Sequence, residues 1–393
     1  MSISPSFHNL TLLLSATAPS IAVPTTAAQL VLARHWLATS DHLLLMGAGA
    51  SVDAGAPTAV GLTDKVVEAV NVERWWDPAA PAFVVRLRDA LRDRTGKPID
   101  IERFYSTLLL LSGRDANALH GLVDRFSVDL THLPSDRPAT MSLDLLARAT
   151  LRHINEILSA LDPAASDYLA APLDSAHAPR TIATLNYDRL LEGAADRAGK
   201  RLDSGAAAWD GGREWPQPDR SSTPLLKLHG SIGWYKRLLQ PPLLPHTPPV
   251  AFGRFALLDE PNPDAVPLGT DLTQVQIFGE GDKVRVHGPT LPLLRAFEAA
   301  LNDVALLVVA GYSFRDSHIN AIIVDWVAAA PNARVIVIDP GLEVGIGGLE
   351  WKRLSAQLAP GDADPASLGN HHLRMTILSY GAAEGLSAIY ASV

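Results

Sequence analysis

The 393-residue sequence contains no cysteine. This absence excludes disulfide bonds, a thiolate nucleophile and every zinc module built from cysteine ligands. The chain also has no apolar run of the roughly 18 residues that a membrane-spanning helix needs. Residues 1–24 lack the basic and long apolar segments of a signal peptide, so we expect a cytoplasmic protein that does not bind membranes.

Charged residues are sparse, at 19% of the chain, and acidic residues outnumber basic ones to give a net charge of −9. Because a negative protein gains little from nucleic-acid phosphates, direct nucleic-acid binding is not expected. The Gly-x-x-x-x-Gly-Lys-Ser/Thr pattern of P-loops is absent, which argues against ATP hydrolysis by this chain. Its length suffices for one large or two smaller globular domains.

One stretch, residues 43–58, runs from an apolar segment into a turn of glycines and small side chains. It reads Leu-Leu-Leu-Met-Gly-Ala-Gly-Ala-Ser-Val-Asp-Ala-Gly-Ala-Pro-Thr, and a helical pattern follows. A strand, a glycine turn and a helix in this order present bare backbone N–H groups and a helix N-terminus to an anion such as a diphosphate. Val52 stands where the dinucleotide fingerprint has its third glycine, so a plain strand-to-helix turn is the alternative.

Short apolar runs and amphipathic stretches predict an α/β fold. Strands are expected at residues 43–46, 181–185, 225–228, 304–310, 334–338 and 373–378. Helical patterns between the first two strands cover residues 62–70, 81–92, 101–111, 116–126 and 141–161. This is more helix than a crossover connection between two parallel strands requires. We predict a Rossmann-like parallel sheet formed by residues 41–61 and 176–393, an inserted, mostly helical subdomain at 62–175, and an N-terminal arm and helix at 1–40.

Three regions have more than one interpretation. The arm at 1–24 is a flexible tail or a subunit contact. The proline-rich stretch 241–289 is expected to form a long irregular excursion over the site, for which a lid is one interpretation, with a possible strand at 273–278. The apolar helices within 101–161 suit subunit packing and an intramolecular core equally well.

Four expected strands end in small or polar residues. These ends are Gly-Ala-Gly-Ala-Ser at 47–51, Thr-Leu-Asn-Tyr-Asp at 184–188, Lys-Leu-His-Gly-Ser at 227–231 and Gly-Tyr-Ser-Phe at 311–314. In an open parallel sheet the carboxyl ends of the strands line one crevice, so residues far apart in sequence meet there. A dinucleotide would fit such a crevice.

In order and spacing these motifs resemble the SIR2 family of NAD-consuming proteins. Gly-Ala-Pro at 55–57, Arg-Leu-Leu at 189–191, Ala-Gly at 198–199 and Val-Ile-Asp at 337–339 add to the likeness, which extends over about residues 40–345. The resemblance implies a Rossmann-like sheet that binds NAD, with a smaller helical module above it.

The sequence departs from the sirtuin deacylases of this family at two places. Their four-cysteine zinc module is missing, and Thr58-Ala59-Val60 follows Pro57 where they carry Asp-Phe-Arg. Both departures argue against peptide deacylation. The Asn-Tyr-Asp and Gly-Tyr-Ser-Phe forms are more similar to the SIR2-like NADases of bacterial anti-phage defence. Members of that group hydrolyse NAD and often act as oligomers beside a HerA-type ATPase or an Argonaute.

The resemblance implies two catalytic residues, Asn186 and His229. Cleavage of the nicotinamide–ribose bond passes through an oxocarbenium-like state, so Asn186 would hold ribose or water at the anomeric face. His229 would accept a proton from a ribose hydroxyl or the attacking water, because a histidine ordinarily titrates near pH 6.5. Asp188 would contact the nicotinamide carboxamide. The residues expected to bind NAD are Gly47, Ala48, Gly49, Ser51, Pro57, Thr58, Asp188, Gly311, Ser313, Phe314 and Asp339. Among them the glycine loop and Ser313 would contact the phosphates, and Asp339 the adenosine ribose.

Purely structural roles are open for the same residues. Asn186 and Asp188 suit the N-terminal cap of the helix expected at 188–199. His229 suits a buried core histidine, and Asp339, before Pro340, suits a turn.

Two further pairs are assigned no chemistry. Asp316 and His318 are interpreted as the start of a helix at 316–329. His371 and His372 are adjacent, and adjacent residues of a strand point to opposite faces, so we expect no metal site.

The sequence therefore predicts an NAD glycohydrolase that releases nicotinamide and ADP-ribose. We expect a homo-oligomeric effector of a prokaryotic anti-phage system that depletes NAD, with a HerA-type ATPase or an Argonaute as its partner. One alternative is a non-catalytic NAD or ADP-ribose binding module that controls an oligomeric assembly. The other is a residual NAD-dependent deacylase or ADP-ribosyltransferase.

Overall fold

The computed structural model describes residues 27–74, 79–96, 98–112, 140–238, 255–259, 274–276, 288–341 and 374–391, and the single residues 351, 354 and 358. The arm expected at 1–24, the helix expected at 116–126, the histidine pair at 371–372 and most of the stretch 241–289 lie outside the described residues.

A seven-stranded parallel sheet forms the centre of the molecule. The sequence predicts the parallel sheet and six of its strands, but not the short strand at Leu202–Asp203. The strand order of the sheet is β10-β9-β8-β1-β2-β4-β3. The strands are β1 (His42–Met46), β2 (Thr181–Thr184), β3 (Leu202–Asp203), β4 (Thr223–Lys227), β8 (Leu306–Ala310), β9 (Arg334–Ile338) and β10 (Met375–Leu378). In the middle, Leu43 of β1 lies opposite Thr181 of β2 on one side and Leu307 of β8 on the other. The chain order reverses at β1, and in such sheets ligands bind at this point.

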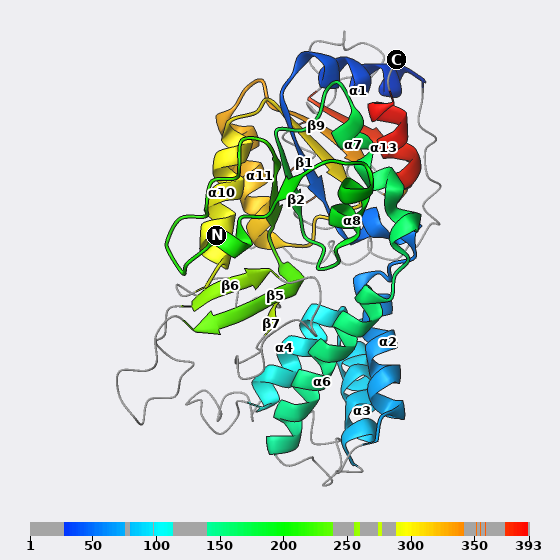
Figure 1. Cartoon of the computed structure of the whole chain (residues 1–393). Coiled ribbons are helices and arrows are strands. Elements are labelled where there is room, and N and C mark those ends of the chain that lie inside the picture. The colour runs from blue at the N-terminus through cyan, green and yellow to red at the C-terminus, as the bar shows by residue number, and fades with distance from the viewer. Residues whose placement is uncertain are drawn as a thin grey trace, which may run out of the picture.

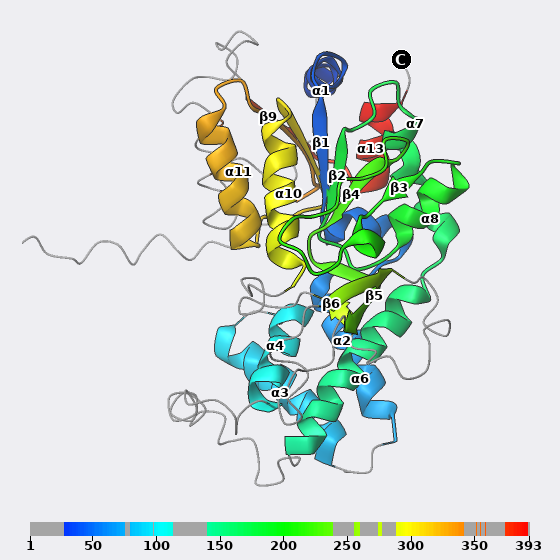
Figure 2. The ribbon, with the colours of Figure 1, turned by 60° about the vertical axis from the view of Figure 1, so that its left-hand side comes forward.

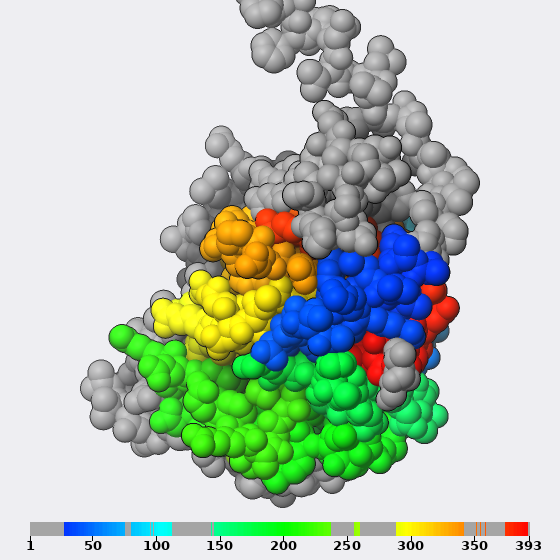
Figure 3. Space-filling view, turned by 90° about the horizontal axis from the view of Figure 1, so that it is seen from above, coloured from blue at the N-terminus to red at the C-terminus, as the bar shows by residue number. Residues whose placement is uncertain are grey.

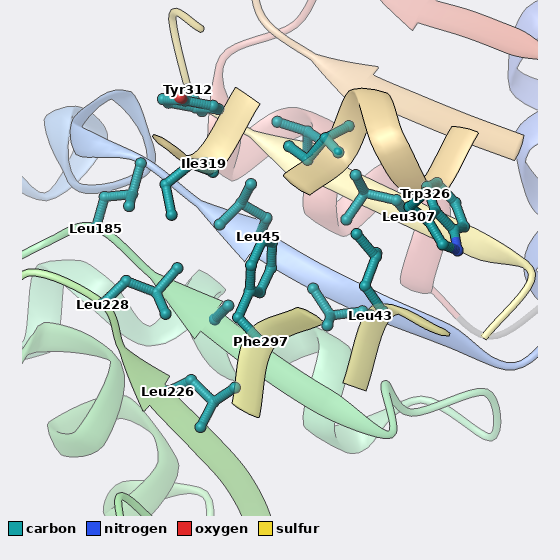
Figure 4. Close-up of a cluster of buried hydrophobic side chains, with 14 of the residues drawn as sticks. Leu43, Leu45, Leu185, Leu226, Leu228, Phe297, Leu307, Tyr312, Ile319 and Trp326 are labelled. Carbon is teal, nitrogen blue, oxygen red and sulfur yellow. The ribbon is translucent and has the colours of Figure 1, made fainter. Parts of the chain in front are cut away.

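Helices cover both faces of the sheet. Figure 2 shows α10 (Thr290–Asn302) and α11 (Ser317–Ala329) on one face, and α7 (Ala171–Asp174), α8 (Leu190–Arg197) and α13 (Ala382–Tyr390) on the other. Because successive strand residues point to opposite faces, Leu43 and Leu45 pack in the first layer, where Figure 4 shows them beside Phe297. Leu44 and Met46 pack in the second. Burial on both faces explains the unbroken apolar run of β1.

The helix α1 (Ala27–Thr39) lies at the amino-terminal end of the sheet. Figure 3 looks down on this end and shows α1 in blue between α10 in yellow and α13 in red. The Arg34 guanidinium donates to the carbonyl oxygen of Ala388 from Nε at 2.8 Å and Nη2 at 2.7 Å. Below it, Nε2 of the buried His42 lies 2.7 Å from the Tyr390 hydroxyl. These contacts join the two ends of the described chain.

A separate helical module lies beyond the carboxyl ends of the strands (Figure 1). It consists of α2 (Ala59–Val72), α3 (Ala79–Thr95), α4 (Ile101–Ser112) and α6 (Thr140–Ser159). Their apolar faces share a core that also takes in Tyr187 and Ile232 from the sheet domain. The following short helices, η4 (Pro163–Ala170) and α7, contribute Leu169 and Leu173 to the core of the sheet domain. Helix-to-helix packing of the module thus ends near Ser159.

A small antiparallel sheet, β6-β5-β7, follows the histidine motif. It consists of β5 (Gly230–Leu238), β6 (Phe255–Asp259) and β7 (Gln274–Gln276), and Figure 1 shows it between the main sheet and the helical module. The strand β7 lies within the possible strand at 273–278, whereas the sequence analysis does not predict β5 and β6. Trp234 of β5 and Phe255 of β6 belong to an aromatic cluster with Trp209 and Trp215.

Candidate functional site

A cavity of about 830 Å³ opens where the carboxyl ends of the strands meet the helical module. The turns after β1, β2, β4, β8 and β9 all contribute to its lining, and α4 supplies the facing wall. On the α4 side the lining residues include Asp100, Glu102, Arg103, Ser106, Thr107 and Leu110. The fold therefore brings the predicted strand ends together in one place.

The glycine turn after β1 packs directly on the turn after β8. The Gly47 N–H donates to the carbonyl oxygen of Ala310 at 3.0 Å, and the Gly49 N–H donates to that of Gly311 at 2.8 Å. A Cβ on Gly47 would lie 2.6 Å from the Gly311 oxygen, and one on Gly311, where φ is 63°, would lie 2.1 Å from Ala50 N. Glycine is required here by the close approach of two turns.

This packing corrects one expectation about the glycine turn. The N–H groups of Gly47 and Gly49 are not bare, because both donate to the neighbouring turn, and the N–H of Ala50 donates to the Gly47 carbonyl oxygen at 2.9 Å. Of these residues, Ala48 and Gly49 line the cavity, while Gly47 and Ala50 are not among the lining residues. Contact with an anion therefore falls to other groups of the turn.

Two side chains of the turn after β2 form a hydrogen-bonded series with a serine of the turn after β1. Asn186 Nδ2 donates to Ser51 Oγ at 3.0 Å, and Ser51 Oγ donates to Asp188 Oδ2 at 2.9 Å. The other oxygen of Asp188 accepts from the N–H of Leu190, the first residue of α8, at 3.1 Å. This bond satisfies the first N–H of α8, although the N-cap position itself belongs to Arg189. Burial raises the pKa of this carboxyl.

The amide oxygen of Asn186 has a different environment from its nitrogen. Oδ1 is buried and has no hydrogen-bond partner within the protein, although Asn186 lines the cavity. Buried polar atoms in folded proteins are nearly always paired, so an unpaired one beside a cavity suits a ligand or water partner. This oxygen is a ready acceptor for a hydroxyl group.

A buried lysine supports the same turn from below. The Nζ atom of Lys227, the last residue of β4, donates to the carbonyl oxygen of Asp188 at 2.5 Å and to Glu192 Oε1 at 2.8 Å. Lys227 is only 1% exposed, so the pair is shielded from water. The lysine fixes the backbone that orients Asn186 and Asp188.

His229 follows β4 and lies between two carboxylates. Its Nε2 is 2.8 Å from Asp316 Oδ2, and its Nδ1 is 3.2 Å from Glu102 Oε1. The Tyr187 hydroxyl donates to the same Glu102 oxygen at 2.9 Å. Burial and the nearby Glu102 carboxylate raise the pKa of Tyr187 well above its usual value, so the phenol stays protonated as a donor. His229 is buried as a core histidine would be, yet it also lines the cavity.

The remaining expected residues divide into two groups. Pro57, Thr58, Ser313 and Asp339 line the cavity, and Asp339 Oδ1 also accepts from the Gly341 N–H at 2.8 Å, as a turn residue would. Phe314 is not among the lining residues. Its ring packs in the core, 4.8 Å from the Tyr312 ring and 4.7 Å from the Trp351 ring.

Sequence reasoning missed two side chains that contact His229. Asp316 does start a helix, because its Oδ1 accepts from the His318 N–H at 2.9 Å, but its other oxygen faces the histidine. Its place two residues after the Gly-Tyr-Ser-Phe motif was an available signal. Glu102 carries no such signal, because only the orientation of α4 brings it to the site.

Within the described ranges, no group of three or more His, Cys, Asp or Glu side chains could hold a metal ion. None of the helices in the described part of the chain is long and apolar enough to cross a membrane.

Comparisons with known proteins give a family match and several similar structures. The SIR2-like domain family matches residues 180–247, a segment that contains Asn186 and His229. No curated protein matches the chain. A mutant Sir2 homologue in complex with 2′-O-acetyl ADP-ribose is similar at a TM-score of 0.44 and 15% identity, covering 93% of this chain and 95% of the other. A Sir2 homologue–NAD complex is similar at a TM-score of 0.44 and 14% identity, and the match covers 93% of this chain and 94% of the other. A structure described for the mechanism and regulation of Sir2 enzymes has a TM-score of 0.43 and 16% identity, and the match covers 93% of this chain and 97% of the other. Residues 180–247 thus match the SIR2-like domain family, and the described part of this segment belongs to a Rossmann-like parallel-sheet fold.

Proposed function

We propose that this chain is an NAD glycohydrolase, a hydrolase that cleaves the bond between nicotinamide and ribose. One observation carries the proposal: Asn186, with an unpaired buried amide oxygen, and His229 line the same cavity as the turn after β1. The SIR2-like match covers both residues. A cavity of about 830 Å³ lies within the usual range of ligand sites.

The residue types suit the charge that develops in this reaction. When the bond from C1′ to the nicotinamide nitrogen breaks, the electron pair stays on nicotinamide and the ribose becomes oxocarbenium-like. The Asn186 oxygen would hold a ribose hydroxyl or the attacking water, and His229 would take part in accepting the proton of that water. The carboxylates of Glu102 and Asp316, which also line the cavity, favour a positive charge there.

NAD would be bound by the residues that the strand ends supply. We place the diphosphate near Ala48, Gly49, Ser51 and Ser313, and the adenosine ribose near Asp339. Asp188 would face the nicotinamide carboxamide, with Pro57 and Thr58 beside it. NAD is the substrate in this scheme, and no metal takes part in the proposed reaction.

The test is release of nicotinamide from NAD by the purified chain. Asn186→Ala and His229→Ala are each expected to lower kcat by at least about 100-fold, since each removes a group that acts on the reacting sugar. Asn302→Ala and His177→Ala change exposed residues of the same types outside the cavity and serve as controls. NAD binding without nicotinamide release by the wild-type chain would instead identify a binding module that controls an assembly. Consumption of NAD only in the presence of an acyl-peptide or protein acceptor would identify a deacylase or ADP-ribosyltransferase.

In the cell we propose that the activity serves anti-phage defence in the cytoplasm by depleting NAD. The similarity of the Asn-Tyr-Asp and Gly-Tyr-Ser-Phe motifs to defence NADases supports this role. Because an unregulated NADase would kill its host, we propose gating by a homo-oligomer and a HerA-type ATPase or Argonaute partner. Phage plating on cells that carry the wild-type chain or His229→Ala, with the full gene neighbourhood, tests the role. Equal phage plating efficiency on the two kinds of cell would contradict the role in defence. Light scattering on the active sample gives the oligomeric state.

A further inference from the structure

Three titratable side chains form a continuous series that joins the sheet domain to the helical module. Asp316 contacts Nε2 of His229 at 2.8 Å, and Glu102 contacts Nδ1 at 3.2 Å. Asp316 belongs to the N-terminus of α11, whereas Glu102 lies in the first turn of α4. We call this series the Asp316–His229–Glu102 chain.

Asp316 is the fixed end of this chain. Its Oδ1 accepts from the N–H groups of His318 at 2.9 Å and Ile319 at 3.3 Å, and its side chain is 6% exposed. Because these bonds anchor one oxygen on the helix, the other is held toward Nε2 of His229. A carboxylate in this position favours the form of the ring with hydrogen on Nε2.

The opposite ring nitrogen then needs a proton of its own to contact Glu102 favourably. A neutral imidazole carries only one N–H. With hydrogen on Nε2, Nδ1 presents a lone pair to the Glu102 oxygen, and two lone pairs repel each other. The contact is therefore favourable only when a proton lies between Nδ1 and Oε1. His229 and Glu102 form one proton-accepting unit.

Glu102 is the end of this unit that is open to the cavity. Its side chain is 26% exposed, compared with 8% for His229 and 6% for Asp316, and it lines the cavity. The Tyr187 hydroxyl holds its Oε1 at 2.9 Å. Other charged or titratable side chains on this part of the lining are Asp100, Arg103, Arg315 and His318.

We propose that Glu102 is a further catalytic residue, the group through which the attacking water loses its proton, and that Asp316 is a positioning residue for His229. The water oxygen forms a bond to C1′ while the bond from C1′ to the nicotinamide nitrogen breaks. The electron pair of the broken bond remains on nicotinamide. One water proton passes to Glu102 and is shared with His229. The products are nicotinamide, ADP-ribose and that proton. The inference rests on the proposed NAD hydrolysis.

A consequence follows for the helical module. Because Glu102 lies on α4 and the rest of the reacting groups lie on the sheet domain, the site is complete only when the module is docked as it is here. Any partner that shifts α4 would then change kcat.

The experiment compares kcat and KM for NAD in Glu102→Gln, Glu102→Asp and the control Glu298→Gln, an exposed glutamate on α10. Glu102→Gln keeps the size of the side chain but cannot accept a proton, so kcat should fall at least about 100-fold with KM within about threefold. Glu102→Asp keeps a carboxylate and should retain more kcat than Glu102→Gln. Thermal unfolding and ADP-ribose binding, which need no turnover, show that the variants are folded.

Asp316→Asn provides the second measurement. An amide can donate to Nε2 and so favour hydrogen on Nδ1, which should lower kcat at least about tenfold, whereas Asp325→Asn, exposed on the same helix, should not. Retention of kcat within threefold by Glu102→Gln, or an effect on KM alone, would overturn the inference while leaving the proposed function intact. A wild-type chain that binds NAD without releasing nicotinamide would overturn both.

Discussion

The amide nitrogen of Asn186 donates to the hydroxyl of Ser51 at 3.0 Å, and so one strand end is joined to another across the centre of the sheet. The same Ser51 hydroxyl donates a hydrogen bond to Asp188 Oδ2 at 2.9 Å. The bond fixes the amide with its nitrogen toward the protein, which leaves the buried oxygen as the atom for the cavity. A side chain of the glycine turn thereby decides how the candidate catalytic residue is presented.

Ser51→Ala tests this relationship. Removing the hydroxyl leaves the buried Asp188 Oδ2 without its donor and allows the Asn186 amide to rotate. We expect a loss of about 1–2 kcal/mol in the free energy of unfolding and a fall in kcat of about tenfold. Chemical denaturation and nicotinamide release measure the two effects. Ser387→Ala, at an exposed position of α13, is the control, and unchanged kcat in Ser51→Ala would contradict the prediction.

Gly311→Ala tests the close approach of the two turns. Gly311 and Gly199 have nearly the same φ, 63° and 68°, but a Cβ on Gly199 meets nothing within 4 Å. Gly199→Ala should therefore lower the free energy of unfolding by only about 1 kcal/mol, the cost of holding alanine in a left-handed backbone conformation. Gly311→Ala adds a clash with backbone and should cost about 4 kcal/mol or more and abolish NAD binding. Similar unfolding midpoints for the two variants would show that the turns can separate.

Lys227→Met tests the buried support beneath Asn186 and Asp188. The change leaves Glu192, whose side chain is 16% exposed, without its cation and should cost about 3 kcal/mol in stability. Adding Glu192→Gln should recover part of this loss, because no unpaired charge then remains. Denaturant titration of Lys227→Met, Glu192→Gln and the double variant gives the interaction free energy between the two side chains. Additive losses would mean that the pair is energetically independent.

The stability of the chain should depend on pH through His42. Burial lowers the pKa of this histidine from 6.5 to about 4 in the folded state. The neutral ring therefore contributes stability above pH 6.5, and this contribution is lost as the pH falls toward 4. Between pH 7.5 and pH 5 the wild-type chain should lose about 2 kcal/mol more than His42→Gln. Urea denaturation at both pH values measures the difference, with His35→Gln, at an exposed position of α1, as control. Equal pH dependence in wild type and His42→Gln would contradict the assignment.

Much of the fold was readable from the sequence. The strands β1, β2, β4, β8, β9 and β10 are short apolar runs, and the covered faces of a parallel sheet require such runs. The antiparallel strands β5 and β6 were not predicted, because the histidine motif at 228–231 reads as the end of one strand and not as the start of another. The helix α13 was missed as well, since no cap signal sets it apart from the preceding strand.

The candidate site was predictable only where its residues belong to strand ends. The sequence by itself determined the parallel sheet and the meeting of residues such as Asn186 and His229 at its carboxyl edge, because strand polarity and apolar patterning are local properties of the chain. Only the tertiary structure decided that Glu102 and Asp316 contact His229 and that N–H groups of the glycine turn donate to the turn after β8. Those contacts depend on how α4 and α11 are rotated and docked, and packing between distant segments sets that geometry.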